Sequence, residues 1–276
     1  MNTPDNDDFR GRYYAVTGGT QGLGAAVAQL LAKRNAAGLI ICGRNKEAGA
    51  AQADILHQHG CEALFVEADI SDPAACTRVI SSAEQHFGTL HGLVNCAGMS
   101  DRGTILDTSP ELFDAIFAVN IRAPFFLMQE TMRLMIKTSV AGSIVNIITM
   151  ASHGGQSFLA PYAASKGALV TLTKNAAFSA MRNRIRVNGL NIGWMDTPHE
   201  DQIQKRYHHA TSGWLADAER LQPFGRLLKP LEVAKAVAFL LSDESGMMTG
   251  SVIDFDQGVA GCGDNGTPQP PSPLSL

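Results

Sequence analysis

A tyrosine and a lysine lie four residues apart in the stretch APYAASKGAL, at Tyr162 and Lys166. In a helix, positions i and i+4 share one face, so the lysine ammonium can reach the tyrosine hydroxyl. A phenol has a pKa of about 10, and a fixed cation beside it lowers that pKa by favouring the phenolate. A tyrosine tuned in this way could exchange a proton with an alcohol. For this short stretch alone an ordinary surface helix is the favoured interpretation, so the rest of the chain must decide.

A glycine-rich stretch near the N-terminus, TGGTQGLG from Thr17 to Gly24, follows an apolar run and opens a helical pattern. Gly18, Gly22 and Gly24 permit a tight turn and a close approach of the backbone to a ligand. The helix behind them can then offer free N–H groups to a pyrophosphate. This context of strand, turn and helix predicts a dinucleotide-binding loop rather than a turn alone.

The elements that must position these residues are short apolar runs alternating with amphipathic segments. Seven runs read as buried strands, at residues 13–18, 39–43, 63–69, 92–98, 143–149, 185–193 and 251–255. The alternation predicts an α/β fold, a doubly wound (Rossmann-type) parallel sheet of about seven strands with helices on both faces and ligands at the carboxyl ends of the strands. We expect a single domain over residues 1–261 and a Pro/Ser-rich tail over residues 262–276.

Composition excludes several classes of function. The 276 residues are 45% hydrophobic, and 22 basic and 26 acidic side chains are spread along the chain, giving a net charge of −4 with no basic stripe for nucleic acid. The acidic N-terminus lacks the features of a secretory signal, and no apolar stretch approaches the ~20 residues of a membrane span. We therefore expect a cytoplasmic protein with a small-molecule substrate and neither nucleic acid nor membrane as a partner.

Cysteine and histidine usage gives no sign of a metal centre. The five cysteines are odd in number and widely spaced, which favours free thiols in a reducing compartment over disulfides or a metal site. His208 and His209 are adjacent but have no further ligand at a suitable spacing. We expect no metal.

The order of these motifs resembles the short-chain dehydrogenase/reductase family, from about Gly11 to Gly261. TGGTQGLG is similar to the family's TGxxxGxG cofactor loop, NCAG to its NNAG with Cys96 in place of the second asparagine, and YAASK to its YxxxK. GWMDT resembles the PGxxxT loop with Ile192 replacing the proline, and Gln257 replaces a glycine after the last strand.

The resemblance implies roles for four catalytic residues. Tyr162 would be the proton donor or acceptor, and Lys166 would lower its pKa and hold the nicotinamide ribose. Asn120 would hold a water that links Lys166 to solvent. Thr149, thirteen residues before Tyr162, stands at the place of the catalytic serine and would supply the second hydrogen bond at the reacting oxygen, with Ser152 as the alternative hydroxyl.

The resemblance also implies a nicotinamide-dinucleotide site. Besides Tyr162 and Lys166, its residues would be Gly18, Thr20, Gln21, Gly22, Leu23, Gly24, Arg44, Asp69, Ile70, Asn95, Ala97, Gly98, Met195 and Thr197. Asp69 would contact the adenine, although capping a helix is an equally physical role for it.

The residues after the second strand bear on the choice of cofactor. Gly43 stands where relatives that use NAD carry an aspartate, and Arg44 follows it. A basic residue there can accept the 2′-phosphate of NADP, whereas an acidic one binds the free ribose hydroxyl of NAD. The sequence favours NADP, with NAD as the alternative, and Gln21 weakens the case because relatives that use NADP often carry a second basic residue at that position.

These observations predict an oxidoreductase that moves a hydride between NADP(H) and a secondary alcohol or ketone. The polar and aromatic segment 195–224, with Asp101 and Arg102, favours a hydroxylated substrate such as a sugar or polyol, while a 3-oxoacyl compound is also open and the segment reads equally well as a solvated loop. Two other classes are a non-catalytic dinucleotide-binding regulator, suggested by the departures at Thr149, Ile192 and Gln257, and a sugar-nucleotide epimerase, disfavoured by the glycine spacing. The resemblance further implies a homotetramer.

Overall fold

The computed structural model describes residues 9–262, so all but the first residue of the expected tail at 262–276 lies outside the described residues. Seven parallel strands form one sheet in the order β3-β2-β1-β4-β5-β6-β7. Their bounds are β1 (Tyr13–Thr17), β2 (Gly38–Gly43), β3 (Glu62–Glu67), β4 (Gly92–Asn95), β5 (Ser143–Ile147), β6 (Arg186–Ile192) and β7 (Val252–Phe255). Each strand overlaps one of the seven apolar runs, and the expected fold class is confirmed.

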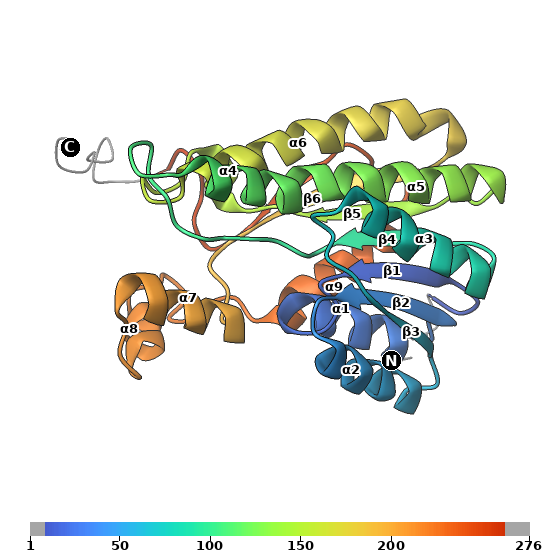
Figure 1. Ribbon diagram of the computed structural model, residues 1–276, viewed down its shortest axis with the longest axis horizontal. Coiled ribbons are helices and arrows are strands. Elements are labelled where there is room, and N and C mark those ends of the chain that lie inside the picture. Colours follow the sequence, from blue (N-terminus) through green and yellow to red (C-terminus); the bar gives the residue numbers. More distant parts are fainter. Residues whose placement is uncertain (1–8, 263–276) are drawn as a thin grey trace.

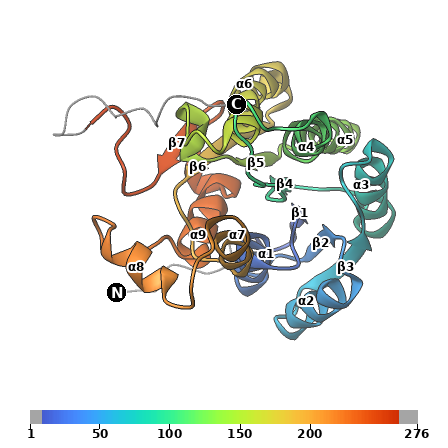
Figure 2. The ribbon, with the colours of Figure 1, turned by 60° about the vertical axis from the view of Figure 1, so that its left-hand side comes forward.

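Helices cover both faces of the sheet (Figures 1 and 2). One layer holds α1 (Gly22–Lys33), α2 (Lys46–Gln58) and α9 (Pro230–Leu241), and the other holds α3 (Pro73–Phe87), α4 (Pro110–Phe117), α5 (Ala123–Lys137) and α6 (Ala160–Ala180). Every residue of β4 and β5 is buried, because helices pack on both sides of these strands. This double burial explains why the strands are continuous apolar runs rather than alternating ones.

Side chains just outside the helices fix where several of them begin. Asn45 accepts a hydrogen bond from the backbone N–H of Ala48 at the start of α2, and Asp72 accepts one from Ala74 at the start of α3. The carboxylate of Asp69 instead accepts from the N–H of Ser71, outside any helix. The capping role considered for Asp69 is therefore wrong, because Asp72 performs it.

The winding of the sheet reverses between β1 and β4. β1 pairs with β2 on one side and with β4 on the other, so the loops after β1 and β4 emerge next to each other. The Thr17 hydroxyl joins them by accepting from the N–H groups of Cys96 (3.0 Å) and Ala97 (3.1 Å). In open α/β sheets this switch point is where ligands bind.

Residues 197–227, here called the lid, leave the sheet after β6 and return before α9. They contain α7 (Pro198–His208) and α8 (Trp214–Arg220), which stand outside both helical layers in Figure 1. Two backbone hydrogen bonds close the base of the lid, from Asp196 N to Leu228 O and from Leu228 N to Trp194 O, both 3.0 Å. The two ends of the lid are therefore joined to each other by backbone hydrogen bonds.

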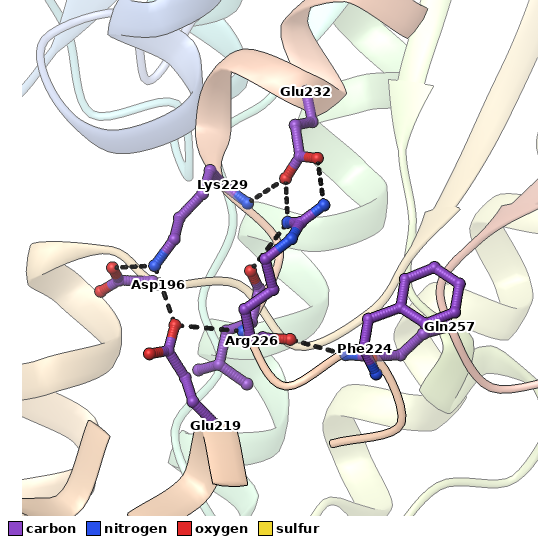
Figure 3. Close-up of polar contacts among 8 residues, drawn as sticks. Asp196, Glu219, Phe224, Arg226, Lys229, Glu232 and Gln257 are labelled. Atoms are coloured by element: carbon purple, nitrogen blue, oxygen red, sulfur yellow. Dashed lines mark hydrogen bonds and ion pairs between the residues drawn. The ribbon is translucent and has the colours of Figure 1, made fainter. Parts of the chain in front are cut away.

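Ion pairs and the hydrogen bonds of the Gln257 side-chain amide reinforce the base of the lid (Figure 3). The Lys229 ammonium bridges Asp196 (3.0 Å) and Glu219 (2.9 Å). The Gln257 side chain accepts from Phe224 N (2.8 Å) and donates to the backbone oxygen of Arg226 (2.9 Å). Gln257, one of the departures from the family pattern, thus anchors the lid to the segment after β7.

The helices of the described residues include none that is long and apolar enough to cross a membrane.

Candidate active site

Tyr162 lies in the first turn of α6, held in place by the loop after β4. Gly103 N donates to Phe158 O (3.0 Å), and Ala160 N donates to Gly103 O (3.1 Å). Burial raises the pKa of Tyr162 above its ordinary value, and the Thr149 hydroxyl, placed to hydrogen-bond the phenol, opposes that rise. The charges of Glu200 and Arg102 also act on the phenol, in opposite directions. The phenol is thus kept protonated next to a second hydroxyl.

Lys166 is buried one turn further along α6. Its Nζ donates to the backbone oxygen of Ile147 at the end of β5 (2.7 Å), and burial lowers the pKa of Lys166 to about 8. The i, i+4 spacing predicts a Tyr162 pKa lowered by this ammonium, whereas the structure shows a raised one. The cost of burying a phenolate prevails, and the ammonium is engaged by β5.

Asn120 is fully buried in a π-helical turn, Ala118–Arg122, between α4 and α5. Its Oδ1 accepts from Met99 N (2.8 Å), and its Nδ2 donates to Met99 O (2.9 Å) and to Ser165 Oγ (3.0 Å). Ser165 in turn donates to the backbone oxygen of Tyr162 (2.7 Å). Asn120 therefore ties the loop after β4 to the helix that carries the tyrosine, and π turns of this kind often occur at functional sites.

The two candidate hydroxyls after β5 have different surroundings. Thr149 precedes a short helix, Met150–His153, and its hydroxyl accepts from Ala151 N (3.2 Å) beside the phenol of Tyr162. Ser152 donates to Oδ1 of Asn191 at the end of β6 (3.2 Å). The structure brings Thr149 to the tyrosine and gives Ser152 another partner.

The glycine-rich loop fits a dinucleotide. Gly18 and Gly22 have φ of 63° and 54°, which L side chains rarely adopt, and a Cβ on Gly18 would lie 3.0 Å from the Cα of Ala97. At Gly22 the nearest atom to such a Cβ is the Thr197 methyl at 3.8 Å, so the backbone is open to a ligand on this side. Gln21 does not cap α1 with its side chain, which leaves the helix N-terminus ready for a pyrophosphate.

A cavity of about 820 Å³ continues from the loop after β4 towards the ends of β2 and β3. Arg44, Asp69 and Ser71 line it from the loops after β2 and β3, and most of the remaining lining comes from α4, the following turn and the start of α5, including Phe117, Val119 and Phe125. The Arg44 guanidinium helps to lower the pKa of Asp69, whose carboxylate is held first by Ser71. The cavity is mainly apolar, and the Arg44 and Asp69 side chains place polar groups at the ends of β2 and β3, where the adenosine half of the cofactor is expected.

Other expected cofactor residues divide into two groups. One group lies in the loops after β1 and β4 and at the base of the lid, and consists of Thr20, Ala97, Gly98 and Met195. The other group, Leu23 and Ile70, has buried side chains. Asn95 differs most, because its Nδ2 donates to Asn146 on β5 (2.8 Å), inside the sheet. Its side chain braces β4 against β5.

Sequence reasoning missed two residues that hold the site together. Thr17 joins the loops after β1 and β4, and its position as the first residue of TGGTQGLG could have indicated it. Ser165 lies inside YAASK, yet nothing in the spacing shows that it faces Asn120. Within residues 9–262 no cluster of three or more His, Cys, Asp or Glu side chains could hold a metal ion.

Comparison with known proteins agrees with this geometry. The sequence model of the family described as "Enoyl-(Acyl carrier protein) reductase" matches residues 18–260. Versicolorin reductase stcU of Emericella nidulans is 31% identical over 264 residues, which cover 94% of this chain and 99% of the relative. The chain belongs to the short-chain dehydrogenase/reductase family.

Other members of the short-chain dehydrogenase/reductase family are similarly related. 2-(S)-Hydroxypropyl-CoM dehydrogenase 3 of Xanthobacter autotrophicus is 33% identical, covering 89% of this chain and 95% of the relative. The crystal structure of NAD⁺-bound xylitol dehydrogenase superposes with a TM-score of 0.83 at 27% identity, covering 91% of this chain and 99% of the other. Like its relatives, this short-chain dehydrogenase/reductase is an oxidoreductase that uses NAD(P) and acts on alcohol or ketone groups.

Proposed function

We propose that the protein interconverts a secondary alcohol and a ketone with NADP(H), using Tyr162 as the proton-transferring group. The observation that carries this proposal is the meeting of Tyr162 and Thr149, whose hydroxyl lies beside a partly buried phenol with a raised pKa. The reduction of a ketone places negative charge on its oxygen, so the site needs a proton donor and a second hydrogen bond there. These two hydroxyls supply both.

The remaining residues position that pair. NADP(H), when bound on the glycine-rich loop, supplies or accepts the hydride. Lys166 lies beside Gly98, whose Cβ position would be 3.6 Å from its ammonium and from Oδ1 of Asn120, so both side chains flank the loop after β4. The Lys166 ammonium would hold the nicotinamide ribose. Asn120 joins the loop after β4 to α6 through its hydrogen bonds with Met99 and Ser165.

The choice of NADP over NAD is supported by the packing at Gly43. A Cβ there would lie 2.9 Å from the methyl of Thr20, so an aspartate that binds a ribose hydroxyl would require the Thr20 side chain to move. Arg44 next to it is exposed and lines the cavity, where its guanidinium can pair with a 2′-phosphate.

The substrate class is open within alcohols and ketones. The relatives' names mention versicolorin, 2-(S)-hydroxypropyl-CoM and xylitol, so similarity alone does not select a substrate. A sugar, a polyol or a 3-oxoacyl compound remains the proposed range, in a cytoplasmic homotetramer. The regulator alternative is disfavoured, because Tyr162 and Thr149 are together and Gln257, one of the departures that suggested it, has a structural role.

A direct test follows the absorbance of NADPH and NADH with a panel of sugars, polyols and oxo-esters. We expect turnover with a higher kcat/KM for NADPH, and a Tyr162→Phe variant that binds NADPH normally but loses most of the turnover. The control is Tyr13→Phe, which removes a hydroxyl on β1. Undiminished activity in Tyr162→Phe would contradict the mechanism. A higher kcat/KM for NADH than for NADPH would contradict the assignment of the cofactor.

A further inference from the structure

Arg102 is a shielded cation in the loop after β4, which contacts the segment just before Tyr162. Its side chain is only 13% exposed, while Arg206 nearby on α7 is 70% exposed. The five-residue stretch that carries Arg102 is fixed at both ends, at Met99 by Asn120 and at Gly103 by the residues that precede Tyr162. The charge of Arg102 acts on the Tyr162 phenol. The guanidinium also lies over the ring of Phe158, four residues before Tyr162, so it lies near the start of α6.

Neighbouring groups orient this guanidinium but do not use all of it. Nη1 donates to Ser100 O (2.8 Å), and Nε donates to Nε2 of His208 (3.3 Å). The ring of Phe158 lies 5.6 Å from the guanidinium carbon and packs edge-on against His208. Arg102 is thus held in one orientation by the loop after β4 and by the lid.

Glu200 forms an ion pair with Arg102 but does not hydrogen-bond to the guanidinium. Nη2 of Arg102 lies 3.7 Å from Oε1 of Glu200, too far for a hydrogen bond. The same Oε1 already accepts from Trp194 (2.8 Å) and Gln204 (2.7 Å). Among the described residues, Nη2 therefore makes no hydrogen bond. Nη2 and the second N–H of Nη1 form the outer edge of the guanidinium.

We infer that Arg102 binds an anionic group, in the first place a carboxylate, on the alcohol or ketone substrate. A carboxylate matches the fork of two N–H groups that the guanidinium presents, and such charge-assisted pairs are strong where water is excluded. Because Arg102 contacts Phe158 just before the start of α6, an anion bound to it can belong to the same molecule as the oxygen that reacts at Tyr162. This inference rests on the proposed function and narrows its substrate to acids.

The lid contacts the loop that carries Arg102. The Tyr207 hydroxyl donates to Asp101 (2.6 Å), and Arg206 also approaches Asp101 (3.4 Å). These contacts join α7 to the loop that carries Arg102, next to its bond with His208. The lid thereby shields the fork from water, which strengthens its preference for an anion.

The test is a binding measurement that needs no knowledge of the natural substrate. The protein saturated with NADP⁺ is titrated by calorimetry with butanoate, cyclohexanecarboxylate and benzoate, and with the matching neutral amides. The emission of the two tryptophans, Trp194 and Trp214, which stack 6.0 Å apart and donate to Glu200 and Asp201, reports whether binding is near this site. We expect at least one acid to bind tenfold or more tightly than its amide, with a change in emission.

Variants then assign the preference. Arg102→Gln should abolish it, Arg102→Lys should keep part of it, and Arg206→Gln should keep all of it while removing the same charge. Thermal melts verify that each variant is folded. Equal binding of acids and amides, no binding of either, or an equal loss in Arg206→Gln would overturn the inference.

Turnover separates this inference from the proposed function. Methyl 4-oxocyclohexanecarboxylate has a ketone but no charge, so its reduction with NADPH tests hydride transfer without the Arg102 contact. If it is reduced while acids have no advantage, the inference fails and the proposed function stands. If no ketone, acid or ester, is reduced while acids still bind through Arg102, the proposed function fails.

Discussion

The Ser152 hydroxyl donates to Oδ1 of Asn191 at 3.2 Å. This hydrogen bond joins the segment after β5 to the end of β6 and does not involve the tyrosine. Asn191 is buried and also donates to Asp254 on β7 (2.7 Å). This network fixes the backbone after Thr149 and commits Ser152 to it. The threonine is left as the hydroxyl that assists Tyr162, and its β-branch restricts χ1 to few orientations.

We therefore expect Thr149→Ala to lower kcat by roughly 10²–10³, as the loss of one oxyanion-type donor does. Thr149→Ser should remain active because it keeps the hydroxyl, and Ser152→Ala should cost little turnover. Steady-state kinetics on all three variants measures this ranking. An inactive Ser152→Ala beside a nearly normal Thr149→Ala would assign the role to Ser152.

The buried Lys166 predicts a dependence of stability on pH. Its pKa is lowered to about 8 in the folded state from 10.5, so between these values the unfolded chain binds more protons, and its contribution to the free energy of unfolding rises with pH. Lys166→Met removes this contribution. We expect the stability of the variant relative to the wild type to fall by on the order of 2–3 kcal/mol between pH 7 and pH 10.5.

Urea denaturation at several pH values measures this difference. Lys174→Met, at an exposed position of the same helix, is the control and should show a smaller dependence on pH. A constant difference between Lys166→Met and the wild type across this range would show that the lysine is not desolvated in the folded state.

Arg44 predicts the response of cofactor choice to charge. Arg44→Asp should lower kcat/KM for NADPH by about tenfold or more and raise the relative use of NADH, because an attraction to the 2′-phosphate becomes a repulsion. The control Lys46→Asp makes the same change of charge two residues away, at a residue that does not line the cavity. Equal effects in both variants would assign the change to the general field of the protein.

The outer face of α6 predicts an assembly surface. Phe178 is 76% exposed and Met181, directly after the helix, is 50% exposed, and large exposed apolar side chains of this kind favour burial between subunits. We expect light scattering to give a tetramer for the wild type and a smaller species for Phe178→Asp. Leu221→Asp, in the lid and 80% exposed, should leave the tetramer intact. A monomeric wild type would contradict this proposal.

The sequence alone determined the strands, the glycine loop and the placement of Tyr162 and Lys166 one turn apart on one helix. Strands buried on both faces require continuous apolar runs, and these are visible in any single sequence. The φ values of Gly18 and Gly22 are local as well, since a tight turn between a strand and a helix demands glycine whatever surrounds it.

Tertiary structure decided which partner each of these residues has. Lys166 donates to Ile147 on β5, Asn95 faces Asn146 across the sheet, and Arg102 meets His208 from the lid, 106 residues away in the chain. Spacing describes only neighbours within one element, whereas these contacts depend on the order of the strands and on where the lid returns. The pKa of Tyr162 follows the same division, because burial, which no local pattern measures, outweighs the lysine one turn away.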